Sequence, residues 1–422
     1  MHYFTREWVK QGHRVLVVNY QAKFPKVFYW LARLLKGRIT SKVGYTVPTM
    51  AVADRKYQMD GVDVYRVCLK KQKPHSRYSQ HEIKKALDRT MAYCKELDFQ
   101  PDAVAAHWSN PQLELMCQLK AHFNVPTCYI AHDAGHFKEF GEDAKRLWDA
   151  VDIVGYRSAA IKRRFETTKE YVRPSFMCYS GIPASYNDNI KARKFQDVRS
   201  VAYVGTLIKR KYPVQIITAL TRSAGTNFSI SYAGEGQEAE AIKAEAERLG
   251  VTENVRLLGR IDRNEVIKLL DETDLFIMIS RNETFGLVYL EAMARGCITI
   301  ASRNEGFDGI IEDGKNGFLC EAGNSDELAE IIERIKQLTP QQRIEISTNA
   351  MNTARALTDG NVAAYYLEQI VKLRQQRAAG RQADWDIGGD CVTQINTDNT
   401  DFDGKGKKFA GIGKRLKRND YL

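Results

Sequence analysis

Residues 275–301 constrain the fold most, because two short apolar runs flank a segment of helical composition. The runs Leu275–Ile279 and Ile298–Ala301 have the length and composition of buried parallel strands. Residues 287–295, between them, favour a helix. Strand, loop, helix and strand form one βαβ unit, which predicts an α/β protein built on parallel sheets.

The start of the helix in this unit suits an anionic ligand. Phe285, Gly286 and Leu287 stand where we expect the helix to begin. A helix N-terminus offers free backbone N–H groups and a partial positive charge, so it suits a diphosphate. Gly286 would let the backbone approach the phosphates closely.

Two glutamates, Glu283 in the loop and Glu291 about one turn into the helix, accompany this feature. Their separation corresponds to roughly 12 Å of helix, so the two carboxylates can flank a bound diphosphate and accept hydrogen bonds from sugar hydroxyls. A nucleotide sugar offers that arrangement of ribose, diphosphate and hexose. A surface helix with two solvated glutamates is the ordinary alternative, and the spacing alone does not separate the two.

The length of 422 residues leaves room for two α/β domains. The net charge of +11 is concentrated in residues 1–100, which hold 20 basic and 8 acidic residues. A basic region predicts an anionic partner. No nucleic-acid-binding motif is visible, so we favour an anionic membrane surface and expect no nucleic acid.

The stretch 20–38 is basic and aromatic, which suits an amphipathic element lying on anionic lipid. An ordinary helix packed on the sheet, with Lys and Arg reaching solvent, is the alternative. The 8 cysteines are scattered without Cys-x-x-Cys pairs and indicate buried thiols rather than disulfides or zinc ligands. We therefore expect a cytoplasmic protein that associates peripherally with the inner face of a membrane.

Two further positions stand at predicted strand ends. His132 follows the predicted strand 126–131, and the carboxyl ends of parallel strands carry binding residues in α/β sheets. A plain loop histidine is one alternative, and a metal site formed with Asp133 and His136 is another. In the second half of the chain, Gly205 and a basic cluster follow the predicted strand 201–204.

Glu283 and Glu291, with seven residues between them and Ala292–Gly296 after them, resemble the donor-site motif of retaining glycosyltransferases of group 1, family 4. Segments around 176–183, 310–318 and 361–375 extend the resemblance over most of the chain. It implies the GT-B fold, with two doubly wound, Rossmann-like parallel-sheet domains facing each other across a cleft.

The resemblance also implies the domain boundaries. Residues 1–190 would form an acceptor-side domain, and residues 191–358 would bind the nucleotide sugar. Residues 359–377 would form a helix crossing back to the first domain. Residues 378–422, polar and then basic, fall outside the resemblance, and we expect them to be disordered.

The implied activity is retaining, metal-independent transfer of a hexose from a nucleoside diphosphate-sugar to a glycan or lipid-linked glycan, as in polysaccharide biosynthesis, without a cofactor. Glu283 and His132 would contact the transferred sugar, and Lys211 would stabilise the leaving diphosphate. Glu291 would bind the ribose diol. The full donor-site set is Gly205, Thr206, Lys211, Glu283, Phe285, Gly286, Leu287 and Glu291.

Two departures from the family pattern leave alternatives open. Thr206 stands where an arginine is usual, so either Lys209 or Arg210 substitutes for it or the donor binds more weakly. The usual opening strand and glycine-rich loop are missing before the helix 3–11, so we expect residues 1–422 to be poorly stable or inactive. A sugar epimerase or phosphorylase of the same fold and a non-catalytic nucleotide-sugar-binding subunit remain the other readings.

Overall fold

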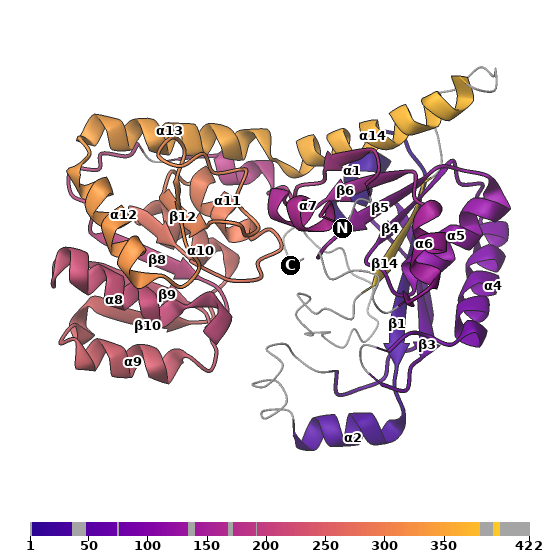
Figure 1. The fold of residues 1–422 in the computed structure, drawn as a ribbon, viewed down its shortest axis with the longest axis horizontal. Coiled ribbons are helices and arrows are strands. Elements are labelled where there is room, and N and C mark those ends of the chain that lie inside the picture. The colour runs from indigo at the N-terminus through magenta and orange to yellow at the C-terminus, as the bar shows by residue number, and fades with distance from the viewer. Residues whose placement is uncertain are drawn as a thin grey trace, which may run out of the picture.

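The computed structural model describes residues 2–35, 48–73, 76–133, 140–167, 172–190, 192–379 and 391–396. These residues form two α/β domains that lie side by side, each built around its own sheet (Figure 1). The predicted pair of parallel-sheet domains is therefore confirmed.

The first domain covers its sheet with helices on both faces. Its elements are α1 (His2–Lys10), β1 (Val15–Lys23), α2 (Lys26–Leu34), β2 (Arg55–Met59), β3 (Val62–Lys70), α4 (Gln80–Glu96), β4 (Ala103–His107), α5 (Gln112–Phe123), β5 (Thr127–Ala131), α6 (Asp143–Asp149), β6 (Ile153–Tyr156), α7 (Ala159–Phe165), β7 (Ser175–Met177) and, from far along the chain, β14 (Cys391–Asn396). The strand order is β2-β3-β1-β14-β4-β5-β6-β7. All neighbours pair in parallel except β2 and β3.

The second domain contains a purely parallel sheet in the order β10-β9-β8-β11-β12-β13. Its elements are β8 (Ser200–Val204), the 3-10 turn η4 (Lys209–Lys211), α8 (Pro213–Ala224), β9 (Ser229–Ala233), α9 (Ala239–Arg248), β10 (Val255–Gly259), α10 (Arg263–Asp271), β11 (Leu275–Ile277), α11 (Leu287–Ala294), β12 (Ile298–Ser302), β13 (Phe318–Cys320), α12 (Ser325–Gln337) and α13 (Pro340–Ala356). The βαβ unit expected at 275–301 is present as β11, α11 and β12.

The strand β14 differs from the expectation for the end of the chain, because residues 391–396 form a strand. β14 lies in the middle of the first sheet, where it pairs in parallel with β1 on one side and β4 on the other (Figure 1). Two neighbouring parallel strands without this partner would expose rows of unpaired backbone N–H and C=O groups inside the protein, which is energetically costly. Residues 391–396 therefore form a strand between β1 and β4.

The two connections between the domains run side by side. Ile182 N donates to Leu357 O at 3.1 Å, and Asp359 N donates to Ile182 O at 2.8 Å. A Cβ on Gly181 would lie 2.6 Å from Asp359 N, so only glycine permits this close approach of the two backbones. The helix α14 (Asp359–Ala379) then returns to the first domain, where Trp8 Nε1 donates to Ala363 O at 2.8 Å.

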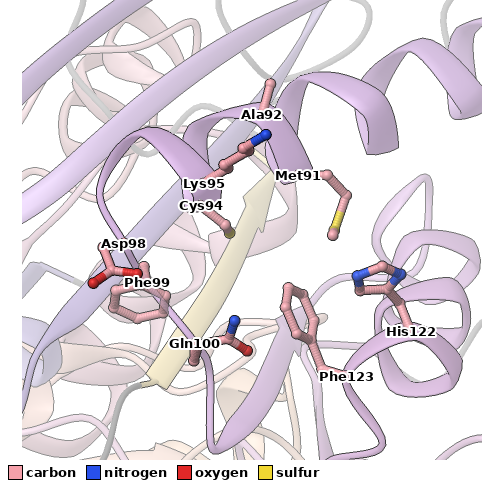
Figure 2. A pocket seen from close by; sticks show the side chains of 9 residues that line it. All are labelled: Met91, Ala92, Cys94, Lys95, Asp98, Phe99, Gln100, His122 and Phe123. Atoms are coloured by element: carbon pink, nitrogen blue, oxygen red, sulfur yellow. The ribbon is translucent and has the colours of Figure 1, made fainter.

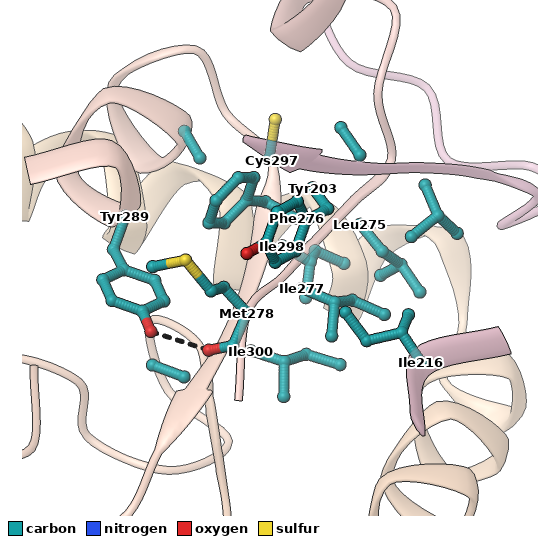
Figure 3. Close-up of a cluster of buried hydrophobic side chains, with 14 of the residues drawn as sticks. Tyr203, Ile216, Leu275, Phe276, Ile277, Met278, Tyr289, Cys297, Ile298 and Ile300 are labelled. Carbon is teal, nitrogen blue, oxygen red and sulfur yellow. Dashed lines mark hydrogen bonds between the residues drawn. The ribbon is translucent and has the colours of Figure 1, made fainter. Parts of the chain in front are cut away.

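The core of the second domain fixes α11 on the sheet. Figure 3 shows this cluster of buried side chains, with Phe276 from β11, Met278 directly after β11 and Ile298 from β12. The buried hydroxyl of Tyr289, on α11, donates to Met278 O at 2.7 Å. This bond links the helix to the end of β11, so the loop between them has defined end points.

Helix α2 has an unusual orientation. Its positions 27, 30, 31 and 34 form one helical face, and Val27, Trp30, Leu31 and Leu34 are all exposed. Only Tyr29 and Ala32 are buried. The amphipathic element expected in this region is thus a helix whose apolar side points away from the protein.

Candidate functional site

The loop before α11 presents open backbone N–H groups. Gly286 is the N-cap of α11 with φ at +86°, and no side chain caps the helix. A Cβ at Gly286 would lie 2.4 Å from the Tyr289 ring, so both the backbone conformation and the packing require glycine. The first N–H groups of α11 are therefore available to an anion, as the sequence predicts.

Lys211, Glu283 and Gly205 come together beside this loop. Lys211 Nζ lies 3.6 Å from Glu283 Oε2, and both side chains are largely buried. A Cβ on Gly205 would lie 3.3 Å from Lys211 Nζ, so the ammonium group rests against the glycine backbone. Glu283 Oε2 is buried and accepts no hydrogen bond from the described residues. An unsatisfied carboxylate oxygen beside a lysine suits a ligand that supplies a hydroxyl group.

The sequence offers Lys209 and Arg210 as replacements for the arginine that is usual at position 206. The structure places these two side chains in surroundings that differ from those of Lys211. Thr206 is exposed. Arg210 Nη1 donates to the carbonyl oxygens of Arg281 and Asn282, at 3.2 and 3.4 Å. The Arg210 guanidinium therefore supports the loop between β11 and α11, and Lys209 is an exposed side chain in η4.

Glu291 belongs to a second, separate group of side chains. Arg263 Nη2 lies 3.4 Å from Glu291 Oε1, and Arg263 Nε donates to the hydroxyl of Tyr186 at 2.8 Å. Burial raises the pKa of Glu291, and Arg263 opposes that rise. A largely buried carboxylate held by one arginine retains acceptor capacity for a diol, which is the chemistry expected of it.

In the first domain, His132 follows β5 and forms a pair with His107 at the end of β4. His107 Nδ1 and His132 Nε2 are 3.0 Å apart, and the hydroxyl of Tyr366, on α14, lies 3.4 Å from His107 Nε2. Trp108 stacks on His132 with ring centroids 4.4 Å apart. Burial lowers the pKa of both histidines, so both imidazoles are neutral at neutral pH. A neutral, fixed His132 can exchange hydrogen bonds with hydroxyl groups.

The loop between β11 and α11 of the second domain touches the first domain. The Tyr179 and Phe285 rings are 5.9 Å apart, and the Arg157 guanidinium lies 5.8 Å from the Phe285 ring. Nearby, Arg163 Nη2 on α7 lies 2.9 Å from Asp308 Oδ2. Side chains from both domains therefore meet at the loop that carries Gly286.

Sequence reasoning missed three residues of this region: His107, Tyr186 and Arg263. The same rule that selected His132, a polar residue at the carboxyl end of a strand, applied to His107. Tyr186 and Arg263 carried no such signal, because their contact with Glu291 joins segments far apart in the sequence. His136, which belonged to the alternative metal site, lies outside the described residues.

The hollow lined by side chains of α4 and α5 lies elsewhere. Figure 2 shows it between the ends of the two helices, lined among others by Lys95, Phe99 and Phe123. Its volume is about 400 Å³. The hollow lies at the amino end of β4, whereas His107 lies at the carboxyl end of the same strand. It is therefore not part of the site described above.

Comparison with family models gives a match in the second domain. Residues 187–353 match the family model described as glycosyl transferases group 1. This part of the chain is therefore similar to that family. The glycosyl transferase group 1 match contains Gly205, Lys211, Glu283 and Glu291, so every residue of the second-domain site lies within it.

Curated relatives match over parts of their length. The lipopolysaccharide core biosynthesis glycosyltransferase LpsE of Rhizobium meliloti is 31% identical over 148 residues, covering 35% of this chain and 42% of the relative. The N-acetyl-alpha-D-glucosaminyl L-malate synthase of Bacillus anthracis is 38% identical over 97 residues, covering 23% of this chain and 25% of the relative. The matched segments thus span less than half of these relatives.

Solved structures match over most of the chain. The Anabaena protein HepE in complex with UDP has a TM-score of 0.61 at 18% identity, covering 85% of this chain and 100% of HepE. The lipopolysaccharide outer core galactosyltransferase WaaB has a TM-score of 0.60 at 15% identity, covering 84% and 99%. The two domains of this chain therefore have the GT-B fold.

Proposed function

We propose that the protein is a retaining, metal-independent hexosyltransferase that moves a sugar from a nucleoside diphosphate-sugar to a glycan or lipid-linked glycan. The observation that carries the proposal is the buried Glu283 oxygen without a hydrogen bond, held between Lys211 and the uncapped start of α11. These groups offer an acceptor for a sugar hydroxyl, and one ammonium group and backbone N–H donors for a diphosphate, side by side.

The roles divide between the two domains. Lys211 and the α11 N–H groups stabilise the charge that develops on the leaving diphosphate, which a metal ion does in other transferases. Glu283 binds the hexose, Glu291 binds the ribose diol, and His132 contacts the sugar from the first domain. The names of the relatives support sugar transfer, and a HepE structure contains UDP-glucose. UDP-sugars are therefore the first donors to test.

Glu291→Ala is expected to weaken nucleoside diphosphate binding by about 1–3 kcal/mol, because a ribose diol would lose its buried partner. Titration calorimetry with UDP, GDP and ADP measures the change. Glu330→Ala, an exposed glutamate on α12, is the matched control and should bind like the wild type. Unchanged affinity in Glu291→Ala would remove the ribose role.

Product analysis separates transfer from the alternatives. Incubation with a radiolabelled UDP-sugar and a glycan acceptor should yield a labelled glycan and UDP, also in the presence of EDTA. A free epimerised sugar nucleotide would indicate an epimerase, and binding without turnover would indicate a non-catalytic subunit. Activity abolished by EDTA and restored by Mg²⁺ would overturn the metal-independent mechanism.

The outward face of α2 supports a lipid-bound location for the acceptor. Trp30 and Leu34 are 61% and 63% exposed. Lys26 and Arg33 on α2, and Lys23 at the end of β1, are also exposed. An apolar helix face rimmed by cations matches the interface of an anionic bilayer. No helix in the part of the chain that the structure describes is long and apolar enough to cross a membrane. We infer that α2 attaches the first domain to the cytoplasmic surface of a membrane.

Replacing Trp30 and Leu34 by serine should reduce binding to anionic vesicles at least tenfold, since burying one such side chain contributes about 1.5–3 kcal/mol. Co-sedimentation with phosphatidylglycerol vesicles measures this, and added salt should weaken wild-type binding. Leu258→Ser, an exposed apolar residue of the second domain, is the control. Equal binding of all three proteins would remove α2 as the membrane contact.

A further inference from the structure

Arg157, the first residue after β6, is a buried cation at the carboxyl edge of the first sheet. Tyr156 pairs with Ala131 of β5, so Arg157 follows directly beside His132. Arg157 N also donates to Ala131 O at 3.3 Å. The Arg157 side chain is nevertheless only 8% exposed. The sheet thus places a guanidinium group next to the histidine proposed to contact the sugar.

The partners of this guanidinium are neutral. Arg157 Nη1 donates to Cys178 O at 2.8 Å, and Nη2 donates to the hydroxyl of Ser180. Burial raises the pKa of the Cys178 thiol and of the Tyr3 hydroxyl, so both nearby groups are uncharged at neutral pH. Arg157 Nε is buried and has no hydrogen-bond partner in the described part of the chain.

A buried cation without a counter-charge is energetically costly, and such groups concentrate at ligand sites. The direction in which the Arg157 side chain points indicates where such a ligand would lie. Its guanidinium faces the Phe285 ring at 5.8 Å, and Phe285 immediately precedes Gly286, the N-cap of α11. An anion held at the start of α11 would therefore lie close to Arg157.

Lys211 is a largely buried cation of the second domain beside the start of α11. Glu283 Oε2 lies 3.6 Å from Lys211 Nζ, so a carboxylate offsets the lysine charge. Thr206 carries no charge, and Arg210 donates to loop carbonyl groups. A nucleoside diphosphate brings at least two negative charges, so a cation from the first domain would strengthen its binding.

We propose that Arg157 binds the diphosphate of the donor from the first domain, through its free Nε and the adjoining Nη group. The inference rests on the proposed function and adds a residue outside the segment that matches the family model. The donor would then be held by both domains, with the diphosphate between Arg157 and the start of α11.

The test compares nucleoside diphosphates with nucleosides. Wild type and Arg157→Met are titrated by calorimetry with UDP, GDP and ADP, and with uridine, guanosine and adenosine. For whichever diphosphate the wild type binds, we expect at least tenfold weaker binding in Arg157→Met, as for loss of a charge-assisted hydrogen bond. Affinity for the corresponding nucleoside should stay within twofold.

Arg343→Met is the matched control, since Arg343 is equally buried but donates only to carbonyl oxygens, including those of Ile335 and Phe195. It should lower the melting temperature without changing the ratio of diphosphate to nucleoside affinity. If Arg157→Met does not fold, Arg157→Lys replaces it, with severalfold weaker diphosphate binding expected.

Two outcomes would overturn the inference in different ways. A folded Arg157 variant that binds the diphosphate as tightly as the wild type removes the role of Arg157 and leaves the proposed function intact. A wild-type protein that binds none of the three nucleoside diphosphates removes the proposed function together with the inference.

Discussion

Removing residues 391–422 should abolish cooperative folding of the first domain, because it takes out the middle strand of the sheet. β14 is in register with β1 at six positions and with β4 at four. Each buried backbone group left unpaired costs about 1–3 kcal/mol, and a whole domain is stable by only about 5–15 kcal/mol. Loss of a few of these pairs would match the entire stability of the domain.

Removal of residues 397–422 alone is the matched control, since it leaves β14 in place. Calorimetric melting should show both domains in this control and only the second domain in the shorter protein. Hydrogen exchange should then show lost protection in β1 and β4. A second variant, Thr393→Pro, removes one N–H from a central strand and should act in the same direction. If the shorter protein melts like the full chain, β14 is not a required part of the sheet.

Lys211→Met should lower kcat by about 10²–10³-fold, equivalent to about 2.7–4 kcal/mol of transition-state stabilisation. The reason is that Lys211 places an ammonium group at the proposed position of the leaving diphosphate, against Gly205 and beside Glu283. Since the charge on the diphosphate grows as the sugar leaves, kcat should fall more than the affinity for the intact donor.

Lys209→Met is the control for the loss of one positive charge, because Lys209 lies in the same 3-10 turn but is exposed. Initial-rate measurements with a UDP-sugar compare the two variants with the wild type. A Lys211→Met enzyme with an unchanged kcat would show that the lysine has only a structural role in holding Glu283.

The predicted part of the site depends on short segments. Glu283, Gly286 and Glu291 lie within one loop and one helix, and the fixed geometry of a helix start places them before any tertiary contact is considered. The position of Lys211 beside Glu283 does not follow from one short segment, because it depends on the pairing of β8 with β11. The chemical roles of these residues stay predictions until the variants are measured.

The sequence predicts that α2 is amphipathic, but it does not predict the direction of the apolar face. The spacing of its apolar residues indicates an amphipathic helix, but periodicity does not say whether the apolar face meets the protein or the solvent. Here Tyr29 and Ala32 alone face the domain, and Trp30 with its neighbours faces outward. The same pattern would have fitted a helix packed on the sheet.

The sequence by itself determined the α/β class, the βαβ unit at 275–301 and the glycine that begins α11, because local hydrophobic patterning and backbone conformation decide these features. Only the tertiary structure showed β14 at the centre of the first sheet and Arg157 beside His132. Both depend on which strands pair, and strand pairing joins segments that are far apart in the chain, as in the register of Val392 with Val104. A six-residue segment of mixed polarity such as Cys391–Asn396 carries only a weak local signal for a central strand. It becomes one because two neighbouring strands need its backbone hydrogen bonds.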